Sequence, residues 1–457
     1  MRFTFQALVL TLAAFPALEA AAAPFAYVPN QGSNNVSVID LATDLVVTNL
    51  KAGIAPVRVA LHPTAAKAYV ANIGSDRVTV INTTSNTVGS SILVGDAPAE
   101  ILVSTDGSQV FTSNTQSSNV TVIATATEQV ITNLPTAYNC RAIAWVSNSV
   151  GNRVYVGSQG NSTVTIINPQ TLAVDKVLTV GSSPRRIAVT PDGSRAYVTN
   201  YGSDDVSVID TVTRTVVTTI PVGDAPRGVA ITPDGQEIWV TNLQGNSISV
   251  ISRATDAVIT NLPAGILPWT PVFNRAGTRA YVLNSGNDNV MVYDVATRTL
   301  LKTIPVGSGP FWAEFNADGS HLYVTTPPDG AVSVIDTASD TNIATIATGL
   351  SAWVIAIQNN TPVPPPALHL DRVDPNSANR GTVVNVGLFG VGFVSGSTVA
   401  FTGNGGRVTV LSTSFVNATN LNVSVNVQPN ARRGGRTVNV ANPDGQTSAM
   451  INGFQVR

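Results

Sequence analysis

The sequence predicts an all-β protein in which a closed β-propeller is followed by a small β-sandwich. Three observations predict this architecture. A unit of about 42 residues recurs up to about residue 358, each unit divides into four short strand patterns, and a proline-rich segment then separates the repeats from a region with a different pattern. A fixed period of this length is typical of propellers and solenoids, because a single unit cannot bury its own apolar face.

The clearest mark of the repeat is a tetrad that begins with an aromatic residue and, in most copies, ends with asparagine. Successive tetrads are 42, 42, 44, 42, 42, 42 and 42 residues apart. The eight copies are YVPN at Tyr27, YVAN at Tyr69, FTSN at Phe111, YVGS at Tyr155, YVTN at Tyr197, WVTN at Trp239, YVLN at Tyr281 and YVTT at Tyr323.

The copy from Pro184 to Gly223 shows the four predicted strands most clearly. Apolar and polar residues alternate within the strands, proline and glycine stand at the corners, and no helical period is present, which is typical of a propeller blade. The strands are expected at Arg186 to Thr190, Ala196 to Asn200, Val206 to Asp210 and Val216 to Val222, with a Pro191-Asp192-Gly193 turn between the first two.

A count of the strands predicts how the propeller closes. The repeats begin at a second strand, Phe25 to Asn30, whereas Trp353 to Ile357 has the first-strand pattern and no successor. We therefore expect a C-terminal strand to complete the N-terminal sheet. This arrangement gives eight blades, with seven as the alternative if one terminal copy lies outside the ring. Closure removes the unpaired sheet edges that favour aggregation.

The composition supports short strands and excludes a strong electrostatic field around the whole protein. Hydrophobic residues make up 44% of the chain and charged residues 11%, against about 25% charged residues in an average soluble domain. The net charge of −2 gives no general attraction to nucleic acid or to anionic membranes. The single cysteine, Cys140, occupies the place that proline holds in most copies, and we expect it to be a small buried residue.

Residues 1–23 have the pattern of an export signal. Arg2 supplies the positive charge, Ala7 to Leu18 supply an apolar core, and Ala20 to Ala23 supply small residues for cleavage. The apolar stretch is too short for a membrane anchor, and no other segment is long and apolar enough to span a bilayer. We therefore expect an exported protein that is either periplasmic or extracellular, for example at the cell surface. The propeller is expected over residues 24–358.

The repeats resemble the YVTN family of bacterial and archaeal extracytoplasmic β-propellers over roughly residues 25 to 358. The resemblance implies a propeller fold, commonly drawn with seven blades in this family, and it implies no functional residue, because the motif residues are scaffold. It is carried by the tetrads, by the VSVID strands at Val36, Val206 and Val332, by the PDG turns at Pro191 and Pro233, and by PVG at Pro221 and Pro305.

Residues 359–367 read as an extended proline-rich linker, and residues 368–457 as a second domain of short strands. The second domain resembles the IPT/TIG family of immunoglobulin-like domains, which implies a small immunoglobulin-like β-sandwich that serves as a spacer or as a site for a protein partner. We expect Arg432, Arg433 and Arg436 to lie in a solvated turn. The resemblance is carried by Pro375, Gly381, Gly392-Phe393, Gly396-Ser397, Asn442 to Gly445 and Phe454.

The sequence predicts no metal site, no cofactor and no catalytic group. The three histidines, His62, His321 and His369, have no spacing that would let two of them share a metal. The polar turns Ser203 to Asp205 and Asn287 to Asn289 are an alternative calcium site, but such residues equally stabilise the turn itself.

One set of positions is a candidate ligand site. The residue after the proline that precedes each first strand is expected at the mouth of the central channel. Around the ring these residues are Val57, Ala99, Arg141, Arg185, Arg227, Trp269, Phe311 and Trp353, and the next position adds Arg58, Glu100, Arg186 and Trp312. Three successive arginines and three successive aromatic residues predict a cationic arc that faces an aromatic arc.

Such a mouth favours a non-enzymatic protein that binds an anionic ligand, a glycan or a protein partner. Guanidinium groups bind carboxylate and phosphate in bidentate fashion, and Trp and Phe provide stacking faces. The first alternative is a lactonase-like or lyase-like enzyme with Glu100 as general base. The second is binding of single-stranded nucleic acid through charge and stacking. The third is a structural role in which the aromatic residues plug the channel and the arginines bridge the blades.

Overall fold

The computed structural model describes residues 24–358, 369–391, 393, 397–403, 407–417, 420–442 and 447–457. The predicted export signal, the predicted linker, Gly392, Gly396 and residues 443–445 lie outside this range. The chain divides into two compact units, Met1–Asn360 and Thr361–Arg457. The described part of the chain is all-β, and it holds no helix that could cross a membrane.

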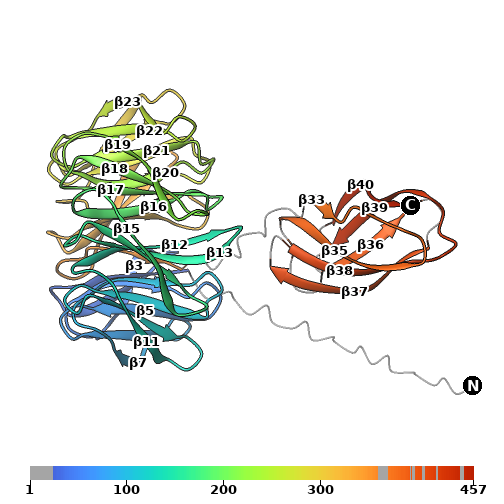
Figure 1. Cartoon of the computed structure of the whole chain (residues 1–457). Coiled ribbons are helices and arrows are strands. Elements are labelled where there is room, and N and C mark those ends of the chain that lie inside the picture. The colour runs from blue at the N-terminus through green and yellow to red at the C-terminus, as the bar shows by residue number, and fades with distance from the viewer. Residues whose placement is uncertain are drawn as a thin grey trace, which may run out of the picture. The chain divides into compact units, whose positions relative to one another are not determined.

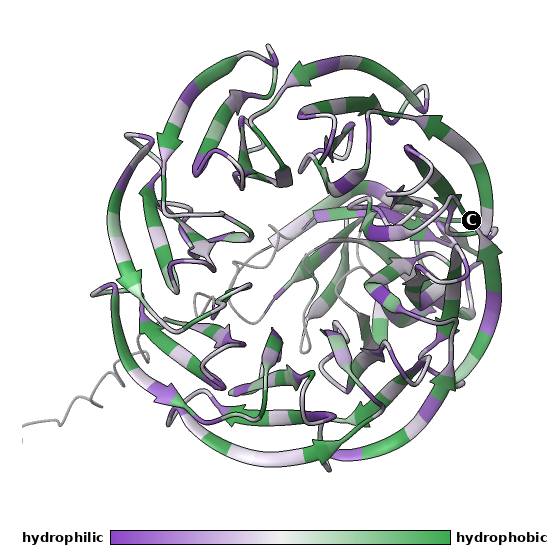
Figure 2. Cartoon of the chain, turned by 90° about the vertical axis from the view of Figure 1, so that its left-hand side faces the viewer, coloured by the Kyte–Doolittle hydropathy of each residue, from purple (hydrophilic) through white to green (hydrophobic). Residues whose placement is uncertain are grey.

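The first unit is propeller-like and contains eight four-stranded antiparallel sheets among its described residues (Figure 1). Figure 2 looks along the axis around which these sheets are arranged. In seven sheets, four consecutive strands pair in chain order. In the remaining sheet, β32 from the end of the unit pairs antiparallel with β1, with Ala26 opposite Ile357 and Tyr27 opposite Ala356.

The strands of the first four sheets have the following bounds. They are β32 (Ala356–Ile357), β1 (Phe25–Asn30), β2 (Asn35–Asp40) and β3 (Leu45–Leu50); β4 (Pro56–Leu61), β5 (Lys67–Asn72), β6 (Arg77–Asn82) and β7 (Thr87–Leu93); β8 (Pro98–Val103), β9 (Gln109–Asn114), β10 (Asn119–Ala124) and β11 (Gln129–Pro135); and β12 (Cys140–Asn148), β13 (Gly151–Ser158), β14 (Thr163–Asn168) and β15 (Ala173–Thr179).

The other four sheets of this unit follow the same order. They consist of β16 (Pro184–Val189), β17 (Arg195–Asn200), β18 (Asp205–Asp210) and β19 (Thr215–Pro221); β20 (Pro226–Ile231), β21 (Glu237–Asn242), β22 (Ser247–Ser252) and β23 (Ala257–Pro263); β24 (Pro268–Phe273), β25 (Arg279–Asn284), β26 (Asn289–Asp294) and β27 (Leu300–Pro305); and β28 (Ala313–Phe315), β29 (His321–Thr326), β30 (Ala331–Asp336) and β31 (Thr341–Ala347).

The turn between the second and third strand of each sheet has one residue in the left-handed region. These residues are Asn34, Asp76, Ser118, Ser162, Asp204, Asn246, Asp288 and Gly330. Asparagine, aspartate and glycine adopt this conformation at lower cost than other residues. The side chains also join neighbouring sheets, since Asp76 Oδ1 accepts a hydrogen bond from Ala97 N at 2.8 Å and Asp204 Oδ1 accepts one from Ala225 N at 2.7 Å.

The polar turns considered for calcium are used by the protein itself. Asp205 Oδ1 accepts a hydrogen bond from Asn200 Nδ2 at 2.6 Å, Asp288 Oδ1 accepts one from Gly309 N at 2.8 Å, and Asn289 Oδ1 accepts one from Asn284 Nδ2 at 2.9 Å. Each oxygen therefore already has a proton donor, which favours the structural interpretation of these turns.

The aromatic residue of each tetrad is buried, and in several copies its hydroxyl group reaches the next sheet. Tyr27 Oη donates a hydrogen bond to Asn86 Oδ1 at 2.6 Å, Tyr281 Oη to Asp340 Oδ1 at 2.9 Å, and Tyr323 Oη to Asp44 Oδ1 at 2.7 Å. The first two contacts join residues 59 positions apart. The third joins the sheet of β28 to β31 to the sheet that contains β1, so the same contact links the two ends of the unit.

The last residue of the tetrad stabilises the adjoining hairpin. Asn114 Nδ2 donates a hydrogen bond to Thr121 Oγ1 at 2.8 Å, and Asn200 Nδ2 donates one to Ser207 Oγ at 2.9 Å. Both asparagines are fully buried. A buried amide needs such partners, because an unpaired one costs about 1 to 3 kcal/mol. The recurring asparagine is therefore a structural residue.

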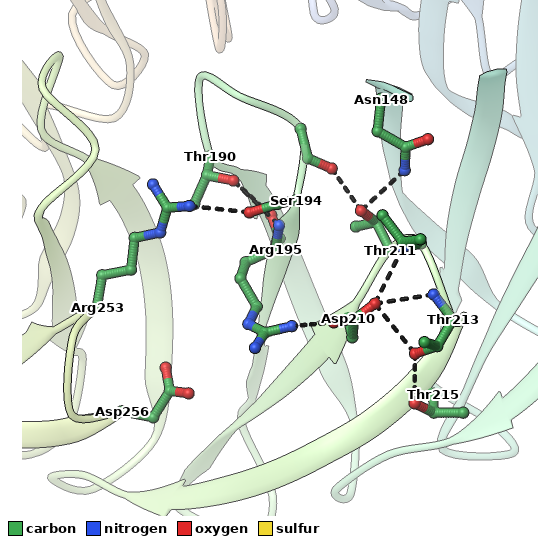
Figure 3. Close-up of polar contacts among 12 residues, drawn as sticks. Asn148, Thr190, Ser194, Arg195, Asp210, Thr211, Thr213, Thr215, Arg253 and Asp256 are labelled. Carbon is green, nitrogen blue, oxygen red and sulfur yellow. Dashed lines mark hydrogen bonds and ion pairs between the residues drawn. The ribbon is translucent and has the colours of Figure 1, made fainter. Parts of the chain in front are cut away.

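Polar contacts also join neighbouring sheets near the turns (Figure 3). Arg253, after β22, donates a hydrogen bond to Ser194 Oγ at 2.9 Å and forms an ion pair with Asp192 of the preceding sheet's first turn. Asp210 binds Arg195 of its own sheet and accepts a hydrogen bond from Thr213 N at 2.8 Å. These charges are satisfied within the scaffold.

The apolar core of this unit lies between adjacent sheets. One cluster contains Tyr197, Val206 and Val208 of one sheet with Ile238 and Val240 of the next, all buried. Other clusters of buried aliphatic and aromatic residues lie at the other interfaces, and β1 packs against residues of β29 and β30 in the same manner. Cys140 is fully buried, as expected, and its Sγ lies 3.3 Å from the carbonyl oxygen of Asn114.

The second unit is a sandwich of two four-stranded sheets (Figure 1). Its core includes Leu388, Phe393, Leu421, Val438 and Phe454. One sheet contains β33 (His369–Asp374), β35 (Thr382–Val391), β38 (Asn420–Val427) and β37 (Val408–Asn417), and the other contains β34 (Ser377–Ala378), β40 (Thr447–Val456), β39 (Gly434–Ala441) and β36 (Thr398–Thr402).

The prediction that Arg436 lies in a solvated turn is wrong. Its side chain is fully buried, and its guanidinium group donates hydrogen bonds to the carbonyl oxygens of Arg432 at 2.8 Å, Gly434 at 3.1 Å and Gly435 at 3.2 Å. Arg436 thus holds the chain that enters β39. The sequence pattern could not reveal this, because the arginine-rich segment has the composition of an exposed turn.

Candidate functional site

All eight first-strand positions that were predicted to surround the mouth line one cavity of about 350 Å³. We call it the mouth cavity. Its lining consists of Val57, Ala99, Arg141, Arg185, Arg227, Trp269, Phe311 and Trp353, of Arg58, Glu100 and Arg186 from the next position, and of Gln31, Ile73 and Gln159. Trp312, the remaining predicted residue, lines a second cavity further along the first strands.

A β-bulge brings two successive side chains toward the mouth cavity. In β16, Pro184 is opposite Asn200 and Arg186 is opposite Thr199, so Arg185 has no opposite residue on β17. The same irregularity occurs at the start of β4, β8, β12, β20 and β24. A bulge redirects side chains that would otherwise alternate between the two faces of a sheet. Arg185 and Arg186 can therefore both line the cavity.

The third residue of the tetrad positions the mouth of the following sheet. Thr199 Oγ1 donates a hydrogen bond to the carbonyl oxygen of Arg227 at 3.0 Å, and Thr241 Oγ1 donates one to that of Trp269 at 2.7 Å. Thr325 Oγ1 likewise lies 3.1 Å from the carbonyl oxygen of Trp353. The sequence analysis treated the whole tetrad as scaffold and missed this role. The signal was the recurrence of threonine in the YVTN copies.

The aromatic side of the mouth cavity is a continuous row of three rings that pack at tilted and edge-to-face angles, and we call this row the aromatic stack. The ring centroids of Trp269 and Phe311 are 4.0 Å apart, and those of Phe311 and Trp353 are 4.8 Å apart. Two polar residues hold the indole groups, since Trp269 Nε1 donates a hydrogen bond to Ser285 Oγ at 2.7 Å and Trp353 Nε1 donates one to Gln31 Oε1 at 2.8 Å. The stack is therefore fixed in place and leaves the cavity beside it unfilled.

Gln31, Gln159 and Ser285 share a position that the sequence analysis did not identify. Each follows directly after the last residue of a tetrad. Ile73 lies in the mouth cavity from the same position, and Tyr201, also at this position, lies under the guanidinium group of Arg185 with 4.7 Å between the guanidinium carbon and the ring centroid. This second set of equivalent positions thus forms part of the mouth or supports it.

Two of the arginines are paired with Glu100. Arg58 Nε and Nη2 donate hydrogen bonds to the two carboxylate oxygens at 2.8 and 2.9 Å, and Arg186 Nη1 lies 3.4 Å from Oε1. Burial alone would raise the pKa of Glu100, but the charges of Arg58 and Arg186 outweigh it and hold the pKa below its ordinary value. The carboxylate stays ionised and paired, which does not suit a general base.

The other three arginines, Arg141, Arg185 and Arg227, form no ion pair within the described residues. The guanidinium carbon of Arg227 lies 3.5 Å from the centroid of Trp269, so the two arcs meet at this pair. Burial lowers the pKa of Arg227, and the neighbouring charges of Arg185 and Arg186 lower it further. Positive charge is thus concentrated without a counter-ion on one side of the cavity.

Two buried donors next to this charge lack acceptors. Arg185 Nε and Gln159 Nε2 are buried and have no hydrogen-bond partner in the described part of the chain, and both residues line the mouth cavity. Buried donors of this kind are uncommon in proteins and call for an explanation. A rotation of either side chain would let an acceptor oxygen of a ligand satisfy them, and such a ligand would offset the charge of the arginines.

His62 contributes to the scaffold. His62 Nε2 lies 2.9 Å from the carbonyl oxygen of Gly107 in the next sheet, and its Nδ1 accepts a hydrogen bond from Ala65 N at 2.8 Å. The described residues contain no group of three or more His, Cys, Asp or Glu side chains that could hold a metal ion. The lining of the mouth cavity also contains none of the His, Cys, Met or Tyr side chains that ligate haem iron.

The comparison with protein families matches residues 136–266 to the model described as lactonase, 7-bladed beta-propeller. This range corresponds to the three sheets from β12 to β23. The described residues of the unit contain eight four-stranded sheets, and the matched part sets no blade number for the whole. No curated protein sequence matches this chain.

Three solved structures show the fold that this chain shares. Dihydro-heme d1 dehydrogenase NirN in complex with DHE is 18% identical, with a TM-score of 0.65 over 77% of this chain and 78% of that one. Hydrazine synthase of Kuenenia stuttgartiensis is 20% identical, with a TM-score of 0.51 over 62% and 96%. A functionally unknown protein from Desulfotomaculum acetoxidans is 17% identical, with a TM-score of 0.50 over 73% and 98%. These similarities show that the fold of the chain is propeller-like, and they show the fold alone.

Proposed function

We propose that this protein is a non-enzymatic binding protein whose mouth cavity takes an anionic ligand with a flat or sugar-like face. The observation that carries the proposal is the set of arginines at Arg141, Arg185 and Arg227, which have no carboxylate partner among the described residues and which lie beside a fixed aromatic stack. Guanidinium groups bind carboxylate or phosphate oxygens in bidentate fashion, and aromatic rings stack on planar or sugar faces.

The size of the cavity agrees with a small ligand. Its volume of about 350 Å³ lies at the lower end of the range of roughly 300 to 1,000 Å³ found for small-molecule sites. One relative in fold, the dihydro-heme d1 dehydrogenase NirN, is titled as a complex with DHE, and the arginine and tryptophan groups of the mouth cavity suit a planar anion that fits its volume. The mouth offers no iron ligand, so the proposed interaction uses charge and stacking alone.

The test compares pairs of probes that differ in charge. Glucuronate is titrated against glucose, and 2-naphthoate against 2-naphthalenemethanol, with intrinsic tryptophan fluorescence and calorimetry as readouts. We expect the anion of each pair to bind at least tenfold more tightly, and Arg227→Gln with Arg185→Gln to remove that preference. Arg153→Gln, outside the cavity and paired with Asp175, is the matched control. Equal binding of the charged and neutral probes would contradict the proposal.

A second candidate function is lactone hydrolysis, which the family match over residues 136–266 favours. The carboxylate considered as its base, Glu100, is paired with two arginines, so hydrolysis would need a different base or a water held by these groups. Release of acid from a panel of γ- and δ-lactones, followed with a pH indicator, tests this function. Hydrolysis that is lost in Glu100→Gln would replace the binding proposal with the enzymatic one.

The proposal extends to the architecture and the location of the protein. We take the eight sheets to close into an eight-bladed propeller of the YVTN kind, supported by the pairing of β32 with β1 and by the hydrogen bond from Tyr323 to Asp44. We take the sandwich to be an immunoglobulin-like domain of the IPT/TIG kind that contacts a protein partner. Export is proposed from the pattern of residues 1–23. The N-terminal sequence of the protein isolated from its native compartment tests the last point.

A further inference from the structure

Within the first strands, one position carries a charged residue in one copy and an aliphatic residue in the other copies. The fifth position of the first strand, counted from the proline or its equivalent, is Ala60, Leu102, Ala144, Ala188, Ala230, Val272, Glu314 and Ala356. Glu314 lies in the middle of β28, opposite Tyr323 of β29. A residue that breaks a local rule without a visible structural gain often marks a functional site.

Glu314 lines a second cavity of about 400 Å³, which we call the inner cavity. Its walls are aliphatic side chains of first strands, including Val59, Leu61, Leu102, Ile143 and Ile355. Arg58, Glu100 and Arg186 line both the inner cavity and the mouth cavity, so they form the layer between the two. Trp312 belongs to the same layer, since the guanidinium carbons of Arg58 and Arg186 lie 5.7 and 5.0 Å from its ring centroid.

The carboxyl group of Glu314 has no cationic partner among the described residues. The other charged groups that line the inner cavity are Arg58 on β4, Glu100 on β8 and Arg186 on β16, and these bind one another. Burial raises the pKa of Glu314 to about 8, and the backbone N–H of Ile357 lowers it in part. Neither guanidinium group is among the causes of this shift, so the arginines do not serve Glu314 as counter-ions.

We propose that the inner cavity binds an aliphatic primary amine, with its ammonium group against Glu314 and its alkyl chain along the aliphatic wall. A lone carboxyl group in an apolar cavity is costly to ionise, and a ligand cation would remove that cost. The aliphatic wall recognises the chain without further polar groups. This site is separate from the mouth cavity, and the proposal does not depend on the anion-binding function.

Binding of the cation should release a proton from the protein. Because burial raises the pKa of Glu314 to about 8, we expect the free protein to hold a proton on Glu314 at pH 7, and a bound ammonium group favours the ionised carboxylate. Each amine that binds should therefore displace about one proton from the protein into the buffer. In calorimetry this release makes the measured enthalpy depend on the ionisation enthalpy of the buffer, whereas binding of a neutral molecule of the same shape releases none.

The experiment titrates the purified protein with n-pentylamine and with 1-pentanol in phosphate and in HEPES at pH 7. We expect the amine to bind at least tenfold more tightly than the alcohol, with release of about one proton per amine. Glu314→Gln should abolish this preference and the proton release. Glu128→Gln, a matched change at the ion pair with Lys67 outside both cavities, should leave them unchanged.

Three results would overturn the proposal. They are equal affinity for the amine and the alcohol, amine binding that Glu314→Gln leaves intact, and amine binding without proton release. If Glu314→Gln does not fold, as judged by circular dichroism, the buffer dependence measured on the unchanged protein still decides. Arg185→Gln and Arg227→Gln should not alter amine binding, so a failure of the anion site and a failure of the amine site give different results.

Discussion

The first and second strands of the propeller-like unit obey opposite rules. The second strands carry nearly the same tetrad in each sheet, and their side chains are buried between sheets or within hairpins. The first strands share a proline or its equivalent and mostly aliphatic residues further along, but the position directly after the proline changes from aliphatic to cationic to aromatic around the axis. In this repeat protein, residues that recur make the scaffold, and residues that break the recurrence line the cavities.

This comparison predicts that substitutions on the two kinds of strand affect different properties, namely stability and ligand binding. A change on a second strand should lower stability whether or not a ligand is present. A change at a first-strand position should alter binding and leave stability nearly unchanged, unless the residue belongs to the layer of Arg58, Glu100 and Arg186. The following changes test this division, from the largest expected effect to the smallest.

Tyr281→Ala should have the largest effect. The ring is fully buried between two sheets, and the hydroxyl group binds Asp340. Loss of a buried aromatic side chain costs about 3 to 5 kcal/mol of unfolding free energy. Urea denaturation measures this loss. Tyr281→Phe keeps the ring and should lose only about 1 kcal/mol. A loss below 1 kcal/mol for Tyr281→Ala would show that the tetrads do not hold the sheets together.

Glu100→Gln should have the next largest effect on stability, because it leaves two guanidinium groups without a counter-ion. We expect a loss of about 2 to 3 kcal/mol at pH 7, below the 3 to 5 kcal/mol of a fully buried pair because these side chains keep some solvent contact. The pKa of Glu100 is lowered in the folded protein, so its contribution is present above pH 4.5 and is lost at lower pH. Denaturation at pH 7 and pH 3 should show a smaller difference between the two proteins at pH 3.

Glu314→Gln should change the pH dependence of stability in the opposite direction. The folded pKa of about 8 exceeds the ordinary value of 4.5, so protonated Glu314 stabilises the fold at low pH. That contribution is lost progressively as the pH rises from 4.5 through 8. The variant should therefore gain stability relative to the unchanged protein over this interval, as measured by urea denaturation. A constant difference between pH 5 and pH 8 would contradict the assigned state of Glu314.

The double variant Arg185→Ala with Trp269→Ala should have the smallest effect on the fold. Both side chains line the mouth cavity and are partly exposed to it. We expect its free energy of unfolding to change by no more than about 1 kcal/mol, while the affinity for an anionic probe falls by tenfold or more. A protein that no longer folds would show that these residues are scaffold.

Thr241→Val sharpens the comparison, because it is a second-strand change that should affect the mouth. The hydroxyl group of Thr241 binds the carbonyl oxygen of Trp269. Valine keeps the shape of the side chain, so we expect a loss of about 1 kcal/mol in stability and a weaker stacking contact with the probe. Ser249→Ala, within the same sheet but in contact with Asn242 and Asn261, is the matched control for binding.

The sequence predicted the strands and the mouth for one physical reason, which is that equivalent residues of a repeat occupy equivalent places. Alignment of the copies placed Arg141, Arg185, Arg227 and Trp269 at one level before their cavity was known. The pairing of Glu100 with Arg58 and Arg186 could not be predicted, because it depends on side-chain reach across neighbouring sheets. Glu314 was open to the same alignment, but only the residues next to the proline were compared.

The most direct test of the account is a crystal structure of the protein with the anionic probe that binds most tightly. The account predicts that the probe's carboxylate lies within hydrogen-bond distance of at least two of the guanidinium groups of Arg141, Arg185 and Arg227, with its flat face against Trp269 or Trp353. A probe bound elsewhere, with the mouth cavity holding only water, would contradict the assignment of the mouth as the binding site.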